Sequence, residues 1–379
     1  MVRIEEIRGR KALVKFVEFQ IDLYKGNPYY VPPIISMEVD NLDIDINPSM
    51  QVGDMVFFMA YDEDNKPVGR IAGIINHRYN KKANTSLCRF GYVDFIDDKN
   101  VSKALFDAVV KWAKTQGMTS LAGPLGMTDF DKEGALIEGF DQKSTISTIY
   151  NYPYYIDHYK AYGLKMEEDT VWLEYYFPMP ESLDKKHLAV AEYIKSHYKL
   201  KSSFVKGSNI ARKNYGPKIF DLLNMTYAML DYVSELDQNQ IDYLINYWLK
   251  LVPLDMIAIV TNDQDDLVAF GATCPSLAEA QQKAKGHLFP FGWFHMLKGL
   301  YWKGGSDTWD LMLIAVHPDY QGKGVSTLLF TQLFESGKKR KFKWVSPYPQ
   351  LEKNYAVHAH WKTLNAKVNR RRATFKKFI

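Results

Sequence analysis

One stretch in the C-terminal half decides how this chain folds. It reads Leu311-Met312-Leu313-Ile314-Ala315-Val316-His317-Pro318-Asp319-Tyr320-Gln321-Gly322-Lys323-Gly324-Val325-Ser326. The largely apolar residues 310–316 predict a buried strand, and the apolar residues that recur at helical spacing through 325–334 predict an amphipathic helix. Two glycines remove side chains from the connecting turn, and the helix behind it presents free N–H groups and the positive end of its dipole. The stretch therefore predicts a site that binds a phosphate or pyrophosphate group.

The glycine-containing turn resembles the signature of the GNAT superfamily of N-acyltransferases, which is Gln or Arg, two residues, Gly, one residue, then Gly or Ala. Gln321 and Gly324 match this signature, and Ser326 takes the place of the last small residue. The preceding Val-His-Pro-Asp-Tyr is also similar to the family's approach to the turn. The GxGxxG and GxxxxGK[ST] patterns of other nucleotide-binding turns do not occur in this stretch. The resemblance implies an acyl-CoA bound through Gln321, Gly322, Lys323, Gly324, Val325 and Ser326.

The same resemblance implies further contacts with the acyl-CoA and shows one departure. In the family, the strand before the turn splays from its neighbour and its backbone pairs with the pantetheine amides, which here would involve Ile314 and Val316. An Asn early in the last helix matches Asn354. The Tyr that protonates the departing thiolate is replaced by Trp361, whose indole has no usable proton near neutral pH. Another proton donor is therefore expected. The neighbouring candidates are Tyr348, Tyr355 and His358.

A general base is also expected, because an ammonium group must lose a proton before it attacks a thioester. Asp310 at the head of the strand and His317 at its end are polar candidates, and Glu352 before the last helix is a third. Each also has a structural reading, since Asp310 can cap the strand and His317 can line the turn. Together with Tyr355, Asp310 and His317 are the residues predicted to take part in catalysis.

The two halves of the chain share one order of predicted elements: hairpin, strand, helix, strand, helix, strand. Alternating strands and helices predict mixed α/β layering in each half. The resemblance implies an α/β (α+β) protein of two GNAT-like domains, each a mixed, mostly antiparallel sheet flanked by helices. Pro178 and Pro180 interrupt the pattern between the halves, which places the domains at residues 1–178 and 179–379.

The first half repeats the element order without the phosphate-binding turn. Its loop before the helix, residues 95–101, has no glycine and carries Asp97 and Asp98, which would repel phosphates. Residues 1–178 are therefore expected to be a degenerate copy that does not bind CoA.

Residues 123–150 form a long irregular connection of the kind that often borders a binding site. Two readings, an acceptor cleft and a domain interface, stay open for Tyr150, Tyr152, Tyr154 and Tyr155. The whole chain is also similar to a group of bacterial proteins of this length, through residues 24–33 and 123–126.

Composition excludes several other classes of protein. The chain has 379 residues, a net charge of +4 and 46% hydrophobic residues, as folded globular proteins do. Two cysteines far apart give neither a disulfide framework nor a zinc site, so no metal is expected. No apolar run reaches about 18 residues and the N-terminus lacks a signal peptide's apolar core, so we expect a cytoplasmic protein with no membrane partner. The basic clusters 338–343 and 370–377 are interpreted as a solvated helix end and an exposed last strand, or as a contact for RNA, a membrane or phosphates.

The expected function is acyl-CoA-dependent N-acyl transfer, with acetyl-CoA as the donor and a small-molecule or peptide amine as the acceptor. A second hypothesis is a CoA-binding regulatory protein that has lost turnover, which Trp361 favours. A third is an aminoacyl-tRNA-using transferase of tandem GNAT fold, whose basic clusters would contact RNA. Outside that third hypothesis no nucleic-acid partner is expected. An oligomer is compatible with the sequence but not specified by it.

Overall fold

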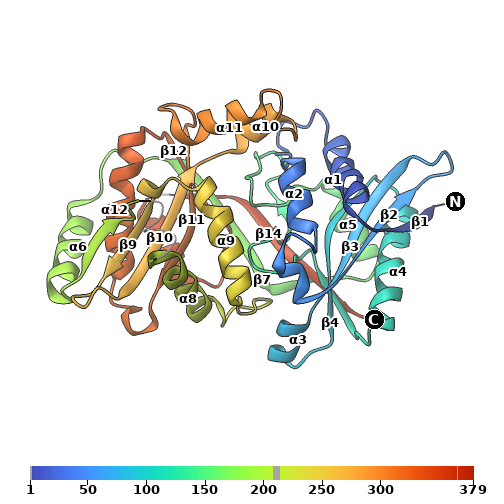
Figure 1. The fold of residues 1–379 in the computed structure, drawn as a ribbon, viewed down its shortest axis with the longest axis horizontal. Helices are drawn as coiled ribbons and strands as arrows, with labels where there is room; N and C mark the ends of the chain where they lie inside the picture. Colours follow the sequence, from blue (N-terminus) through green and yellow to red (C-terminus); the bar gives the residue numbers. More distant parts are fainter. Residues whose placement is uncertain (1, 208–213, 365) are drawn as a thin grey trace.

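The computed structural model describes residues 2–207, 214–364 and 366–379 (Figure 1). The first half contains β1 (Arg3–Ile7), α1 (Arg10–Leu23), α2 (Ile35–Leu42), η1 (Pro48–Gln51), β2 (Gly53–Tyr61), β3 (Pro67–Asn76), α3 (His77–Ala83), β4 (Leu87–Phe95), α4 (Lys99–Thr115), β5 (Ser120–Gly123), β6 (Ala135–Glu138), α5 (Tyr154–Ala161) and β7 (Lys165–Pro178). The second half contains α6 (Lys185–His197), β8 (Lys201–Phe204), α8 (Gly216–Tyr227), α9 (Gln238–Leu251), η3 (Leu254–Met256), β9 (Ile257–Thr261), β10 (Leu267–Pro275), α10 (Ala278–Ala284), α11 (Gly292–Tyr301), β11 (Thr308–Val316), η4 (Pro318–Tyr320), α12 (Val325–Arg340), β12 (Trp344–Pro347), β13 (Gln350–Leu351), α13 (Tyr355–Thr363) and β14 (Lys367–Phe378).

The strands form one continuous sheet in which each half repeats the same pairing. Strands β1 to β4 are antiparallel neighbours and β4 then pairs with β5 in parallel. In the second half β8 to β11 are antiparallel neighbours and β11 then pairs with β12 in parallel. The predicted fold class, mixed and mostly antiparallel sheets flanked by helices, is confirmed.

Strand β14, the last of the chain, returns to the first half. It pairs with β5 on one side and β7 on the other, so both ends of the chain lie in the first half (Figure 1). Strand β7 in turn pairs with β12 and links the two parts of the sheet. The boundary between residues 178 and 179 stays a prediction, and the structure adds that β14 crosses it.

The expectation of an exposed last strand is wrong, because β14 lies inside the sheet. Arg370 and Arg372 are 3% and 1% exposed, and both pair with the buried Glu174 on β7, Arg370 at 2.6 Å. Burial lowers the pKa of Arg372 to about 10, and Glu174 opposes that shift. Arg371 pairs with two acidic side chains, Glu138 and Glu352. These three arginines hold the sheet together instead of forming a basic surface.

Each half has a core between its sheet and one long helix. On α4 the buried residues Val101, Leu105 and Val109 recur every fourth position and face the first sheet. On α12, Val325, Leu329 and Leu333 do the same beneath the second sheet. This spacing keeps one stripe of the helix against the strands, as its sequence predicts. Helix α12 therefore begins at a fixed place beyond the end of β11.

Candidate acyl-donor and acceptor site

The turn from β11 to α12 has the backbone that a phosphate site needs. Gly322 and Gly324 have φ angles of +72° and +75°, a left-handed conformation that costs other residues about 1 to 2 kcal/mol. Gly324 is the N-cap of α12, so the first N–H groups of the helix follow it directly. The Gln321 side chain donates to the Val316 carbonyl at 3.0 Å and closes the turn. The N-terminal end of the helix and its dipole can hold an anion here.

Close packing behind the turn fixes its position. A Cβ atom at Gly324 would lie 2.7 Å from the Ile194 side chain of α6, so the turn rests directly on that helix. At Gly322 no atom lies within 4 Å of such a Cβ, so this residue faces open space. Lys323 is exposed, and its ammonium group lies 5.5 Å and 5.3 Å from the rings of Tyr198 and Tyr320. The turn thus presents backbone and one cation to the solvent.

Strands β11 and β12 diverge before the turn. Their pairing runs from Thr308 with Trp344 to Leu311 with Pro347, and the Tyr348 N–H donates to the Leu311 carbonyl at 2.8 Å. Beyond this point β11 continues to Val316 alongside β10. Ile314 is 39% exposed, and its carbonyl accepts a hydrogen bond from the Tyr227 hydroxyl at 3.2 Å. The strand edge that holds Ile314 and Val316 therefore leads from the turn to the divergence at Leu311.

Asp310 lies just before the divergence and is fully buried. Neither of its carboxylate oxygens has a partner at hydrogen-bonding geometry among the described residues. Burial raises its pKa to about 7, while the nearby Ser276 hydroxyl and the Arg370 charge act in the opposite direction. A carboxyl group with this pKa is partly protonated at neutral pH. Such a group can take up or release a proton, and carboxyl groups with shifted pKa values are common at functional sites.

Tyr348 places a hydroxyl group at the same divergence. The residue is half-buried, and its buried hydroxyl, near Ser147, makes no hydrogen bond among the described residues. Burial raises its pKa well above the usual value, and the charges of Cys274 and Asp310 add to this. Tyr348 lines a cavity of 130 Å³ between the two halves. The other lining residues include Glu38, Tyr92, Asp131, Ser147, Tyr243 and Met296.

The long connection 123–150 inserts into the space between the halves. Asp131 fixes it by accepting hydrogen bonds from Tyr92 at 3.0 Å and Asn41 at 3.1 Å. Phe130 contacts Phe220 of α8, with ring centroids 5.9 Å apart, and lines the 130 Å³ cavity. Phe130 also lines a second cavity of 30 Å³ that Tyr227 and Leu313 border. The connection therefore brings side chains of the first half to the edge of β11.

Asp129 is a half-buried acidic residue that this insertion brings to the edge of β11. It lines the 30 Å³ cavity together with Tyr227 and Leu313. Burial raises its pKa to about 6; Arg89 lowers it and Asp131 raises it further. Sequence reasoning missed Asp129 and Tyr227. The only available signal was the length of the connection that carries Asp129.

The predicted catalytic residues are not brought together. Asp310 lies near the start of β11, and His317 follows its end, about 20 Å away along an extended strand. The His317 ring accepts from the Asp319 N–H at 3.3 Å and so caps the short helix η4. Tyr355 is 77% exposed at the start of α13, and Asn354 is its N-cap. Their roles stay predictions.

The side chains of Trp361 and His358 form hydrogen bonds within the protein. Trp361 is 6% exposed, and its indole N–H donates to Gln350 at 2.6 Å. The two ring nitrogens of His358 lie 3.0 Å from the Tyr175 hydroxyl and 2.9 Å from the Leu351 carbonyl. Neither side chain is available as a proton donor to a ligand.

In the first half, the protein's own tyrosines occupy the matching strand edge. The Phe95 N–H at the end of β4 donates to Tyr155 at 3.1 Å, and the Phe95 carbonyl accepts from Tyr154 at 2.6 Å. Tyr155 also donates to the buried Asp94. Asp98 caps α4 by accepting from the Asn100 N–H, which places a carboxylate where the other half has glycine. None of the four tyrosines considered above lines the cavities described here.

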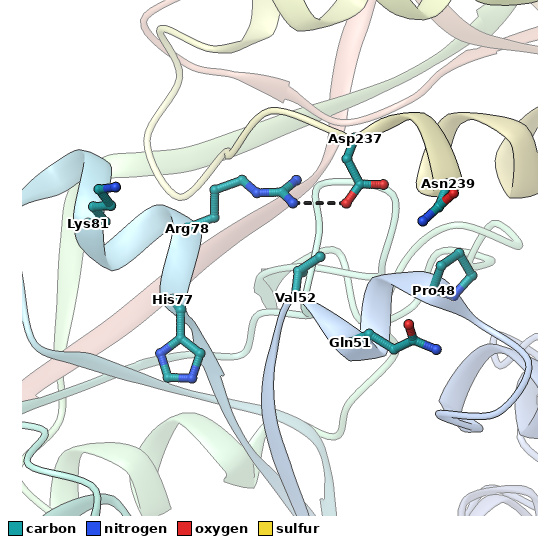
Figure 2. A pocket seen from close by; sticks show the side chains of 8 residues that line it. All are labelled: Pro48, Gln51, Val52, His77, Arg78, Lys81, Asp237 and Asn239. Atoms are coloured by element: carbon teal, nitrogen blue, oxygen red, sulfur yellow. Dashed lines mark hydrogen bonds and ion pairs between the residues drawn. The ribbon is translucent and has the colours of Figure 1, made fainter.

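A larger, open groove of 470 Å³ lies elsewhere between the halves (Figure 2). Figure 2 shows Arg78 of α3 pointing to Asp237, with which it forms an ion pair of 2.9 Å. None of its lining residues belongs to β11, β12 or the glycine turn. The groove lies beside this contact between the halves. Although it is larger than the cavities at β11, it is not part of the site there. Among the described residues no cluster of His, Cys, Asp and Glu has the arrangement of a metal site.

Residues 225–360 match the model of the acetyltransferase (GNAT) family. The chain has the fold of a tandem GNAT protein from the clavulanic acid biosynthesis pathway, with a TM-score of 0.57 and 11% identity, covering 100% of this chain and 98% of that one. Residues 225–360 are therefore GNAT-like in sequence and the whole chain has a tandem GNAT fold, so the predicted resemblance to the GNAT superfamily is confirmed.

Two relatives are similar in sequence. Protein YghO of Escherichia coli (strain K12) is 25% identical over 383 residues, which cover 98% of this chain and 94% of that protein. A bacterial ceramide synthase of Caulobacter vibrioides is 26% identical over 136 residues, 36% of this chain and 35% of that protein. Within the described residues, no helix combines the length and apolar character needed to span a bilayer.

Proposed function

We propose that this protein is an acyl-CoA-dependent N-acyltransferase. The observation that carries the proposal is the left-handed glycine turn at the start of α12, placed at the end of a strand that diverges from its neighbour. Residues 321–326 would hold the pyrophosphate of the acyl-CoA through backbone N–H groups, with Lys323 adding a charge. The edge of β11 at Ile314 and Val316 would hold the pantetheine and direct the thioester to the divergence at Leu311.

The acceptor is an amine that enters between the two halves. Carboxylates of the inserted connection, Asp129 and Asp131, give this space a negative character that favours an ammonium group. Asp129 has a pKa of about 6, so it is mostly ionised at neutral pH and can take the ammonium proton. Positioning of both reactants supplies much of the acceleration in such a ternary complex.

The chemistry balances with this chain's own groups. Asp129 accepts a proton from the ammonium, the freed nitrogen bonds to the thioester carbon, and the carbon–sulfur bond breaks to release a thiolate. The nitrogen gives up its second proton as the amide forms, and this proton replaces the one that the thiolate takes up. The Tyr348 hydroxyl, buried at the divergence, would donate a hydrogen bond to the oxygen or sulfur that becomes negative. Asp310, partly protonated at neutral pH, can return the proton that the thiolate requires.

The donor's acyl chain is acetyl in the simplest case. The relative from Caulobacter vibrioides bears the name of a ceramide synthase, and ceramide is an N-acylated lipid, so a long acyl chain is the second candidate. A transferase that reads aminoacyl-tRNA is less well supported, because Arg370 and Arg372 are buried and paired with Glu174. A CoA-binding protein without turnover shares the donor site and differs in activity alone.

Calorimetric titration with acetyl-CoA and with palmitoyl-CoA tests the proposal. Gly324→Trp would place an indole in the turn, and we expect affinity to fall by more than about tenfold, or ~1.4 kcal/mol. Gly117→Trp is the matched control, because Gly117 has a φ of +74° in open space and incurs similar backbone strain. If Gly324→Trp does not fold, Gly322→Trp makes the same test without displacing Ile194. No binding of either donor to the intact protein would refute the proposal.

A further inference from the structure

An exposed aromatic surface lies on the connection between β10 and β11. Antiparallel neighbours can be joined by a two-residue turn, yet here residues 276–307 intervene and carry α10 and α11. We call the exposed residues of this connection the aromatic face. They are Phe289 (79% exposed), Phe291 (71%), Trp293 (44%), Phe294 (38%), Leu297 (44%), Tyr301 (54%) and Trp302 (54%). An apolar patch of this density marks an interaction site.

Helix α11 is apolar on two neighbouring sides. Met296 and Leu300 are buried, and they pack with Leu277 and Ala280 of the α10 region. Trp293, Leu297 and Tyr301 are spaced four residues apart and form an exposed stripe on the other side. Packing within the protein accounts for the first stripe only.

The part of the connection that carries the aromatic face, residues 280–306, has charges of one sign. Residues 280–306 contain no Asp or Glu. The exposed cations are Lys283, Lys285, Lys298 and Lys303. Trp, Phe and Leu beside Lys without acidic residues is the composition of surfaces that lie in the interface of an anionic bilayer.

We propose that the aromatic face docks this protein on the surface of a bilayer that contains anionic phospholipid. The aromatic rings enter the boundary between head groups and acyl chains, and the lysines contact the lipid phosphates. The expectation of no membrane partner was based on spanning segments, and a surface helix does not need one. Figure 1 shows α10 and α11 side by side along one edge of the molecule.

The helix that carries the aromatic face also lines the cavity between the halves. Met296, on the buried side of α11, lines the 130 Å³ cavity together with Leu277 and Tyr348. The Gly286 carbonyl of the same connection accepts from the Ile35 N–H at 2.8 Å, which ties it to the first half. Helix α11 thus contributes both to the aromatic face and to the lining of the cavity, so docking would bring the cavity to the membrane surface.

Vesicle sedimentation of the full-length protein tests the docking. Vesicles of phosphatidylcholine with phosphatidylglycerol should carry the protein down, and pure phosphatidylcholine or high salt should weaken this. The triple variant Phe291→Ser, Trp293→Ser, Tyr301→Ser should lower partitioning about tenfold or more, because it removes much of the inserted apolar area. The matched control is the pair Ile44→Ser and Phe378→Ser, which also removes exposed apolar side chains.

The outcomes separate a bilayer from a protein partner. Partitioning by the wild type and the control, lost in the triple variant, supports the docking. Absence of wild-type partitioning, or equal partitioning of the triple variant, overturns it. A wild-type dimer in solution that the triple variant makes monomeric, without vesicle binding, would assign the aromatic face to a second copy of the chain instead.

Discussion

The buried carboxylate of Asp310 makes a prediction that needs no substrate. Its pKa rises from 3.8 to about 7 on folding, so ionisation of Asp310 opposes the folded state. A raised carboxyl pKa means that the stability associated with the neutral group is fully present below about pH 4 and is lost as pH rises to about 7. Three pKa units at 1.36 kcal/mol each amount to about 4 kcal/mol.

Asp310→Asn removes the ionisation and keeps the shape. We expect the melting temperature of the variant relative to the wild type to increase steadily from about pH 4 to about pH 7 and then level off. The plateau should differ from the acidic value by about 8 to 16 °C, given about 2 to 4 °C per kcal/mol for a domain of this size. A fixed effect of the amide would shift the whole curve without changing its dependence on pH.

The assay is thermal unfolding of both proteins in a series of buffers from pH 4.5 to 9. Asp307→Asn is the control, because Asp307 lies three residues away but is exposed and pairs with Lys343 at 2.9 Å on the surface. Such a surface pair contributes about 0 to 1 kcal/mol. A difference between Asp310→Asn and wild type that does not change with pH would refute the assignment of a raised pKa to Asp310.

Two further predictions concern the inserted connection and the first half. Asp129→Asn should lower kcat/KM by a factor of about 10² to 10⁴, and the wild type's loss of activity below about pH 6 should vanish in the variant; an unchanged acidic limb would argue against Asp129 as the base. Arg70→Met should cost about 3 to 5 kcal/mol in denaturant unfolding, because it strands the buried Asp94 carboxylate that Arg70 now holds at 2.8 Å. The exposed pair of Arg3 and Glu5 provides a control, since Arg3→Met should change stability by less than about 1 kcal/mol.

Local elements were well predicted wherever neighbouring residues carry the information. The strand expected at 310–316 spans Thr308–Val316, and the helix expected from Val325 extends to Arg340. The glycine turn between them adopts the left-handed backbone that glycine permits. Helices α10 and α11 were not predicted, because the outer stripe of α11 is as apolar as its inner stripe and masks the helical period.

The sequence by itself determined the phosphate-binding turn, because glycine, strand and helix signals are contiguous there and depend on backbone conformation. It also determined the lack of such a turn in the first half, where Asp98 stands as the helix cap. Only the tertiary structure decided that β14 lies within the sheet, that Arg370 and Arg372 are buried, and that Asp129 faces β11. These features depend on pairing between segments far apart in the chain. Such pairing is selected by the apolar burial and charge compensation of the whole fold, which no local pattern of residues encodes.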